Sequence, residues 1–284
     1  MNSRFLHFKR VIRGSFVAIS CLFLVCCDNS TERHNKQILS SESNSSDGSI
    51  DLSVDTIPLP ARKLIAAYPD FNIRYSNNRL IFDDGNSIVY DDGKHKGFVE
   101  KLDNCDIEDM FSMTYKTNNS IPSYLNDCGR GRNEILLKKM YGDNEAAVRK
   151  NLVSVSWFGQ SLRFNKVNGA ADKLGKVASE LSQHPEFHKY LKNASSFYWR
   201  KIKGTNRQSA HSYGIAIDIN TQYSNYWLWS NPKSSEKDKL KYENHIPHEI
   251  VRVFEKYGFI WGGRWYHFDT MHFEYRPEFF ESLL

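Results

Sequence analysis

The chain has 284 residues, of which 40% are hydrophobic and 14% aromatic, so it can bury the core of one sizeable domain with or without an extension. Its 38 basic and 33 acidic residues give a formal net charge of +5. This composition excludes a fibrous chain and a wholly disordered one.

Residues 1–26 have the pattern of a secretory signal peptide. Four basic residues and no acidic one accompany an apolar run at 15–25 that is too short for a membrane span. The run ends in LVCC, which resembles the bacterial lipobox and predicts lipidation of Cys27. Cleavage before Cys26, an uncleaved anchor and simple secretion are the alternatives. We therefore expect a cell-envelope lipoprotein, attached to the membrane by its N-terminal lipid and facing the periplasm or the cell exterior.

The segment at 27–60 predicts a disordered tether. Residues 28–60 contain eight serines and almost no aromatic residue, so they have too little apolar surface to offset the entropy lost on ordering. Removal of the signal takes away four cations and lowers the formal charge from +5 to +1. A nearly neutral protein lacks the excess positive charge with which proteins bind nucleic acid, so we expect no nucleic-acid partner.

Residues 61–150 are interpreted as an N-terminal extension packed on a catalytic domain at 151–284. Within the extension, RLIFDDGNSIVYDDG at 79–93 predicts two short strands around an Asp-Gly turn. GRGR at 129–132 lacks the Lys-Ser/Thr ending of a phosphate-binding loop, so it is interpreted as structural.

Cys105 and Cys128 are the only cysteines outside the signal region. An isolated pair in an exported protein predicts a disulfide, worth about 3 kcal/mol for a loop of this length. Metal binding by this pair is the weaker alternative, because no histidine or further cysteine has zinc-finger spacing to it.

Two stretches of the catalytic domain have clear helical patterns. Apolar residues three and four apart predict a helix at about 166–183, and Pro185 is expected to open a short helix that runs through Leu191. IPHEIVRVFEKYGF predicts a helix that begins at Pro247 and stops at Gly258. The segment between, at 221–246, is first aromatic and then charged, which favours a loop or lid. Its aromatic residues either belong to the core, the favoured interpretation, or line a substrate groove.

SAHSYGIAIDIN at 209–220 carries the first candidate site residues. Its isoleucines alternate with other residues as in a strand with one apolar face, so Asp218 points away from them. A carboxylate there is costly to bury unless a cation or a hydrogen-bond donor meets it. His211 precedes Gly214, which permits a bend that returns the imidazole to the side of Asp218. These are two ligand types that zinc accepts.

A third ligand is sought in HFDTMHFE at 267–274, where His272 and Glu274 share one face of a short strand. Two histidines, a carboxylate and an open fourth position are typical of a catalytic zinc site. Taken singly, each residue has an ordinary alternative, a structural hydrogen bond for the histidines and turn chemistry for Asp269. Only their conjunction favours a metal.

The two motifs resemble those of a known family. SAHSYGIAID is similar to the Ser-x-His-x-x-Gly-x-Ala-x-Asp signature of the zinc D-alanyl-D-alanine carboxypeptidases, which include vancomycin-resistance carboxypeptidases and dipeptidases and phage-type L-alanyl-D-glutamate endopeptidases. DTMH resembles the second motif, an acidic residue three before the last histidine. The similarity runs from about Tyr68 to the C-terminus. It implies one Zn²⁺ held by His211, Asp218 and His272 in an α+β fold, where a small antiparallel sheet carries the site between flanking helices, with an N-terminal extension.

The resemblance also implies an activity, the hydrolysis of a peptide bond in peptidoglycan stem peptides. D-Ala-D-Ala carboxypeptidase activity is the first expectation, with D,D-dipeptidase and L,D-endopeptidase activities as alternatives on the same polymer. A non-catalytic zinc-containing envelope-binding lipoprotein and a purely structural envelope protein are the competing classes. Arg200 matches the arginine that stabilises the oxyanion, with Arg207 as a nearby alternative, and His267 and Ser209 are candidate oxyanion or substrate contacts.

The identity of the catalytic base rests on two arguments that disagree. Strand parity places Glu274 beside His272, whereas the family pattern favours Asp269. A regular strand would aim residues 269 and 272 to opposite faces, but a turn at 269–271 with pairing from His272 onward would bring Asp269 round to the attacking water. We choose Asp269 as the base, which takes the proton of the water and later passes it to the departing amine.

Overall fold

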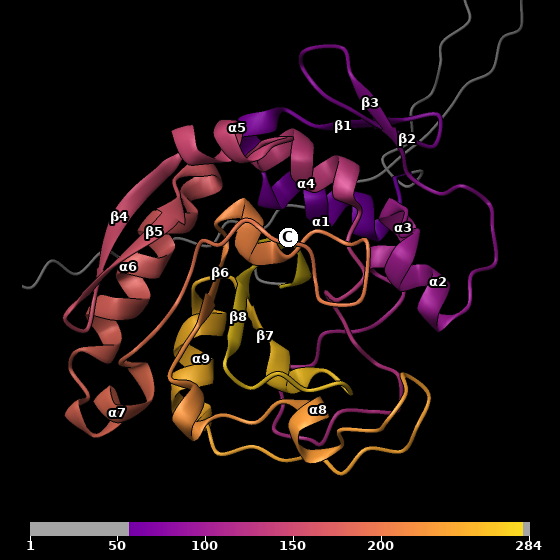
Figure 1. Ribbon diagram of the computed structural model, residues 1–284. Coiled ribbons are helices and arrows are strands. Elements are labelled where there is room, and N and C mark those ends of the chain that lie inside the picture. The colour runs from indigo at the N-terminus through magenta and orange to yellow at the C-terminus, as the bar shows by residue number, and fades with distance from the viewer. Residues whose placement is uncertain (1–56, 281–284) are drawn as a thin grey trace, which may run out of the picture. The chain divides into compact units, whose positions relative to one another are not determined.

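The computed structural model describes residues 57–280, which belong to one compact unit (Figure 1). The predicted signal peptide at 1–26, the lipidation site Cys27 and most of the tether at 27–60 lie outside the described residues. Helices combined with small antiparallel sheets confirm the predicted α+β class. None of the helices within 57–280 is long and apolar enough to cross a membrane. The division at residue 150 stays a prediction.

The described chain up to residue 150 combines short helices with one three-stranded sheet. Its elements are α1 (Leu59–Ala67), η2 (Pro69–Phe71), β1 (Arg74–Ser76), β2 (Arg79–Ile81), β3 (Ser87–Val89), α2 (Phe98–Asp103), α3 (Ile107–Met110), α4 (Glu134–Tyr141) and α5 (Glu145–Lys150). β2 and β3 confirm the predicted hairpin, and β1 adds a third antiparallel strand beside β2. Asn133 and Asn144 accept hydrogen bonds from the first turns of α4 and α5, which explains where these helices begin.

The remaining elements contain the second and third sheets. They are β4 (Leu152–Trp157), β5 (Gln160–Asn165), η3 (Val167–Gly169), α6 (Ala170–Leu181), η4 (Pro185–Phe187), α7 (His188–Leu191), η5 (Ala210–Tyr213), β6 (Ala216–Asp218), η6 (Thr221–Tyr223), α8 (Trp227–Ser230), α9 (His248–Lys256), β7 (Phe259–Trp261), η7 (Gly262–Arg264), β8 (His272–Tyr275) and η8 (Pro277–Phe279). The helices predicted at 166–183 and from Pro247 are confirmed as α6 and α9. α6 begins only at Ala170, because Asn168 and Gly169 have positive φ angles of 56° and 69°.

The sheet β6–β8–β7 lies at the centre of the described chain, with β8 between two antiparallel neighbours (Figure 1). α9 packs against β7 and α6, and α6 also covers the β4–β5 hairpin. The alternating isoleucines of the first motif are fully buried in the main core, and the rings of Phe254 and Phe273 stack at 3.8 Å between α9 and β8. Each buried side chain of this size stabilises the fold by about 1.5–3 kcal/mol. This packing fixes the strands that carry the candidate ligands.

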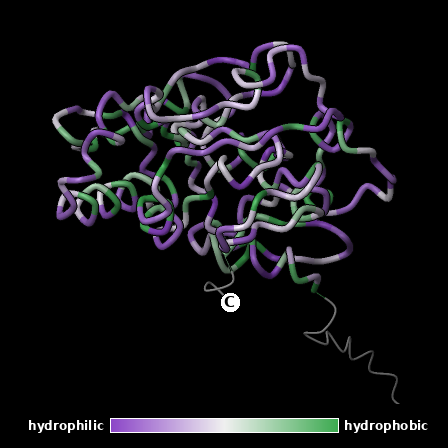
Figure 2. The backbone as a smooth tube through the Cα atoms, turned by 90° about the horizontal axis from the view of Figure 1, so that it is seen from below, coloured by the Kyte–Doolittle hydropathy of each residue, from purple (hydrophilic) through white to green (hydrophobic). Residues whose placement is uncertain are grey.

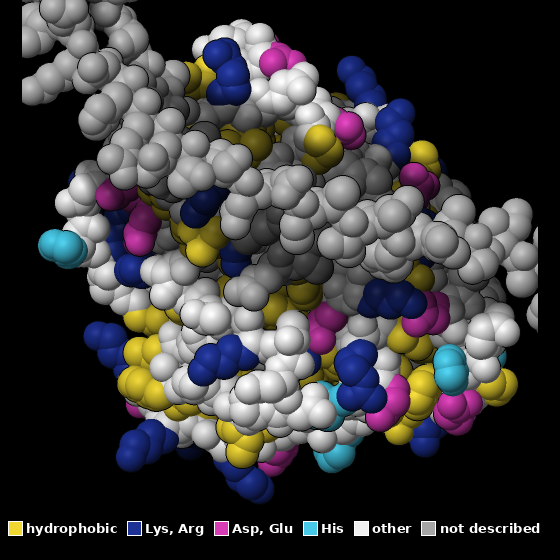
Figure 3. Space-filling model, turned by 180° about the vertical axis from the view of Figure 1, so that it is seen from behind, with side chains coloured by type: hydrophobic (Ala, Val, Ile, Leu, Met, Phe, Trp, Pro, Cys, Tyr) yellow, Lys and Arg dark blue, Asp and Glu magenta, His cyan; other side chains and the backbone are white. Residues whose placement is uncertain are grey.

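The outer loops are predominantly hydrophilic, as the purple segments at the periphery of Figure 2 show. On the described part of the face in Figure 3, Lys and Arg side chains are interspersed with Asp and Glu side chains. The charges of this face therefore mix both signs instead of segregating.

The predicted disulfide between Cys105 and Cys128 is wrong, because both residues are free, buried thiols. Cys105 belongs to the main core and donates a hydrogen bond to the Asp106 carbonyl at 3.3 Å, whereas Cys128 packs in a separate cluster with Ile260, Trp265 and Phe279. Burial raises the pKa of Cys105 to about 12 and also raises that of Cys128. Both groups therefore stay protonated and behave as small apolar side chains.

Candidate metal centre

The bend predicted at Gly214 is present. Gly214 has φ +67° and its N–H donates to the His211 carbonyl at 3.0 Å, closing the short η5 turn ahead of β6. A Cβ atom at this position would lie 2.5 Å from Leu152 Cδ2, so both the backbone and the packing require glycine. The turn directs His211 back toward Asp218 at the end of β6.

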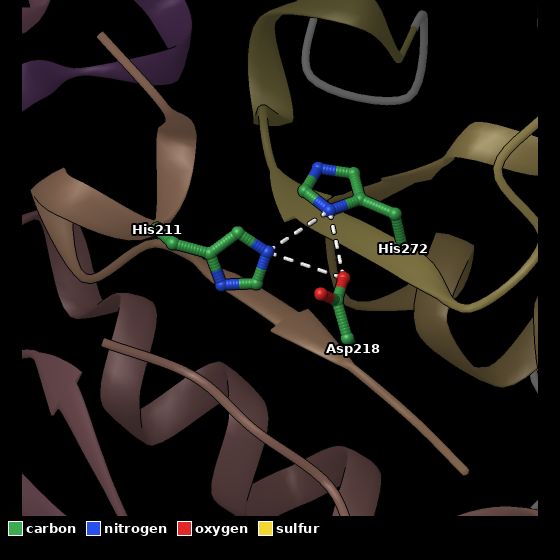
Figure 4. Close-up of side chains that lie close together, drawn as sticks. All are labelled: His211, Asp218 and His272. Atoms are coloured by element: carbon green, nitrogen blue, oxygen red, sulfur yellow. Dashed lines mark hydrogen bonds and ion pairs between the residues drawn. The ribbon is translucent and has the colours of Figure 1, made fainter. Parts of the chain in front are cut away.

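His272 reaches the same point from the neighbouring strand. Asp218 and His272 are directly paired in the antiparallel register of β6 and β8, which places their side chains on one face. Figure 4 shows the three side chains pointing toward one another. His211 Nε2 lies 3.2 Å from His272 Nδ1 and 3.1 Å from Asp218 Oδ1, and His272 Nδ1 lies 3.0 Å from the same oxygen.

These separations fit a tetrahedral zinc ion. Ligand atoms at 2.0–2.1 Å from zinc lie roughly 3.3 Å apart in a tetrahedron. The three atoms of His211, Asp218 and His272 are thus close to the required spacing, and each residue supplies a ligand type that zinc prefers. The residues present therefore fit the metal that the motifs predict.

The outer nitrogen of each histidine has its own partner. His211 Nδ1 lies 2.6 Å from the Ser196 carbonyl, to which its N–H donates, and Nε2 is left free to bind a metal. His272 Nε2 lies 3.5 Å from Glu274 Oε2, so Nδ1 is the nitrogen left for the metal. Both rings are thereby oriented with the metal-binding nitrogen toward Asp218.

The close contact between Asp218 and His272 shifts the pKa values of both groups. Burial alone would raise the pKa of Asp218, but the nearby histidines hold it well below its usual range. Burial alone would lower the pKa of His272, but hydrogen bonds to Asp218 and Glu274 raise it to about 10. A metal ion binding there must displace the proton from His272.

Asp269 lies in a turn and not in a regular strand. The His272 N–H donates to the Asp269 carbonyl at 3.2 Å, and β8 begins only at His272. The alternative that the sequence left open, a turn followed by pairing, is therefore the observed one. Oδ1 of Asp269 is buried and has no hydrogen-bond partner in the described part of the chain. Burial and the neighbouring charge of Asp218 raise the pKa of Asp269 to about 7.

Glu274 has a different position. It is fully buried and accepts hydrogen bonds from Arg132 Nη2 at 2.7 Å and Arg276 Nη1 at 3.0 Å. Its contact with His272 is to Nε2, the ring nitrogen that does not face the other ligands. Glu274 therefore contacts His272 on the side of the ring opposite to Asp218 and His211.

The predicted site residues meet in one cleft of about 550 Å³. The three candidate ligands, Asp269, Arg200, Ser209 and His267 all contribute to its wall. Arg130, Arg132, Lys203 and Arg207 add positive charge, and Tyr226, Trp227 and Trp229 add aromatic surface. Trp229 is 57% exposed, so this residue does not belong to the core, which was the interpretation that the sequence favoured.

His267 is held by residues that the sequence did not single out. Its Nδ1 lies 2.5 Å from Asp127 Oδ2, and its Nε2 lies 3.3 Å from Glu236 Oε2. Arg130 pairs with both of these carboxylates. Arg130 and Arg132 of the GRGR segment at 129–132 line the cleft. Their positive charge was the only sign of this role in the sequence.

Comparison with known proteins agrees with this geometry. Residues 203–275 match the family model described as D-alanyl-D-alanine carboxypeptidase. Over this segment the match supports the family predicted from the motifs. The matched segment contains all three candidate ligands and Asp269, and it supports a metallopeptidase of the general kind that acts on peptidoglycan. No curated protein and no solved structure matches the chain.

Proposed function

We propose that the chain is an exported zinc metallopeptidase that hydrolyses a peptide bond in peptidoglycan stem peptides, of the D-Ala-D-Ala carboxypeptidase type. The observation that carries the proposal is the convergence of His211, Asp218 and His272 at ligand spacing, beside Asp269, in a cleft large enough for a short peptide. The family match over 203–275 supports the same reaction class.

Zinc held by His211, Asp218 and His272 would polarise a carbonyl group and make a neighbouring water more acidic. Asp269 has an unpaired carboxylate oxygen in the same cleft, and nothing in the described chain competes for it. Asp269 therefore takes the proton from the attacking water and later returns it to the departing amine. The turn at 269–272 holds its backbone in place for both transfers.

Arg200 is our candidate for the cation that stabilises the oxyanion or binds a substrate carboxylate. It is exposed, lines the cleft and has no ion-pair partner among the described residues. The backbone of Arg200 is fixed, because its N–H donates to Ser212 Oγ at 2.9 Å. Arg207 is the alternative. Burial and the charges of Arg130 and Arg132 lower its pKa, so an anionic group beside it would relieve cation repulsion.

Ser209 and His267 complete the proposed substrate contacts. Both are buried and line the cleft, and the Ser209 N–H donates to the Arg200 carbonyl at 3.1 Å. Asp127 fixes the ring of His267, and Nε2, which lies 3.3 Å from Glu236 Oε2, is the proposed oxyanion contact. We further propose that Cys27 is lipidated and that the tether at 27–60 holds the peptidase at the envelope, within reach of its polymer.

The test is digestion of purified muropeptides by the full chain with zinc, followed by mass spectrometry. Loss of one terminal alanine identifies a carboxypeptidase, and cleavage between L-Ala and D-Glu identifies an endopeptidase. Hydrolysis of the free D-Ala-D-Ala dipeptide to two alanines, in a parallel reaction, identifies a dipeptidase. His211→Ala should abolish the product, whereas Lys192→Gln, an exposed change outside the cleft, should not. Unchanged muropeptides with zinc-loaded wild-type protein would refute the proposed activity.

A further inference from the structure

A continuous row of buried charges lies behind the candidate metal ligand His272. Glu274 contacts His272 Nε2 and accepts a hydrogen bond from Arg276 Nη1 at 3.0 Å. Arg276 Nε in turn donates to Glu278 Oε1 at 2.5 Å. All three charged residues are essentially fully buried. The row extends from the metal ligand into the interior along β8 and η8.

Two residues far away in the sequence complete the row. Two nitrogens of Arg132 donate hydrogen bonds to the Glu274 carboxylate. Nη2 lies 2.7 Å from Oε2, and Nε lies 3.1 Å from Oε1 and 3.2 Å from Oε2. Tyr68, at the end of α1, donates its hydroxyl to Glu278 Oε2 at 2.5 Å and is itself buried. Both residues lie outside the segment at 203–275 that matches the family model.

The charges within the row compensate one another. Arg132 and Arg276 supply two cations, and Glu274 and Glu278 supply two anions. A buried charge without a partner costs several kcal/mol, so removal of one member leaves its neighbour uncompensated. The hydrogen bonds from Arg132 and Arg276 hold the Glu274 carboxylate at a fixed place beside His272 Nε2.

We propose that Arg132 and Tyr68 are positioning residues of the metal centre, acting on His272 through Glu274 and through the Arg276–Glu278 pair. A carboxylate that accepts the outer N–H of a metal-binding histidine fixes the ring and makes its other nitrogen a better donor. Residues of the segment at 61–150 therefore help to hold the metal ligand His272 in place, in addition to packing on the catalytic domain. This inference rests on the proposed zinc site and does not depend on which bond the enzyme cuts.

The experiment measures zinc affinity of the full chain by competition with a chromophoric chelator. Partners of metal-binding histidines typically contribute 10- to 100-fold to metal affinity, so Arg132→Gln should weaken zinc binding by about that factor. Tyr68→Phe removes only the hydroxyl at the far end of the row and should weaken binding by about two- to fivefold. Arg252→Gln is the matched control, because Arg252 forms an Arg–Glu pair with Glu249 that is more than half exposed. It should bind zinc as the wild type does.

A second readout separates positioning from general stability. With Co²⁺ in place of zinc, the visible absorption bands report ligand geometry, so Arg132→Gln and Tyr68→Phe should shift them and Arg252→Gln should not. If Arg132→Gln does not fold, Tyr68→Phe carries the test alone. Wild-type zinc affinity and spectra in both Arg132→Gln and Tyr68→Phe would overturn the inference and leave the zinc site intact. A wild-type chain that binds no zinc would overturn the proposed function and the inference together.

Discussion

Replacement of Gly214 by alanine tests whether the bend ahead of β6 builds the metal centre. At φ +67°, backbone strain destabilises a residue with a Cβ atom by about 1–2 kcal/mol. The new methyl group would also lie 2.5 Å from Leu152 Cδ2 and 3.3 Å from the Asn165 nitrogen. Overpacking of this kind costs about 1–3 kcal/mol. Reduced freedom of the unfolded chain offsets about 0.4–1 kcal/mol of this, so the expected net loss is about 1–5 kcal/mol.

Urea denaturation of the metal-free protein measures this loss directly. The matched control is Gly159→Ala, because Gly159 has φ +83° but nothing within 4 Å of an added Cβ atom. It should lose only about 1 kcal/mol, from backbone strain. The difference between the two variants isolates the contact with Leu152. In the Leu152→Ala background the penalty of Gly214→Ala should shrink, because the nearest atom is gone.

The variant should also lose zinc affinity by at least about tenfold, because the same turn aims His211 at Asp218. Equal stability of Gly214→Ala and Gly159→Ala would show that the close packing around Gly214 is not what holds the bend. Wild-type zinc affinity in Gly214→Ala would show that the bend is not needed to place His211.

Two further predictions concern the site, and a third concerns the buried cysteines. Asp269→Asn should keep one zinc per chain but lose at least about a hundredfold in kcat on muropeptides, the lower end of what general acid–base catalysis supplies; loss of zinc would instead make Asp269 a ligand. In the metal-free protein the pKa of His272 is raised from its ordinary 6.5 to about 10, so its contribution to stability is complete below pH 6.5 and should disappear as the pH rises toward 10; His272→Gln should abolish that decline in thermal denaturation. Alkylation of the unreduced protein should modify Cys105 and Cys128 only after denaturation, and protection that persists in denaturant would restore the disulfide.

Local patterns predicted the parts of the site that are local in the chain. The alternating isoleucines predicted strand β6 and the side of the strand on which Asp218 lies. Gly214, just before the strand, predicted the bend that follows His211. Apolar spacing located α6 and α9, because each of these helices buries one face against the core. β1 was missed because three residues are too few to show a period and no Asp-Gly turn marks it, whereas the turn at Asp84-Gly85 marked the equally short β2 and β3.

The contacts that local patterns could not predict join distant segments. Arg132 and Glu274 are 142 residues apart, and no spacing rule relates an arginine in a glycine-rich loop to a glutamate on β8. The paired cysteines misled for the same reason, because sequence shows that two thiols exist and not that they pack in separate clusters. Tertiary packing decides both cases.

The choice between Asp269 and Glu274 shows how surroundings assign different roles to two similar side chains. Both carboxylates lie close to His272, but the protein shifts their pKa values in opposite directions. Glu274 is held between two arginines, so its negative charge is already compensated and its proton affinity is low. Asp269 faces the charge of Asp218 without a hydrogen bond to one of its oxygens, and its pKa rises to about 7.

A base must accept a proton readily, and a support for a metal ligand must not. Asp269 has the proton affinity and the free oxygen that the first task needs, whereas Glu274 has the fixed charge that the second needs. A cation bound at the three ligands would lower the pKa of Asp269 by its own charge and move it below neutral pH, where the carboxylate is ionised and ready to accept a proton. Strand parity correctly placed Glu274 beside His272, but on the nitrogen that faces away from the other ligands. These surroundings favour Asp269 as the proposed base and Glu274 as the residue that positions His272.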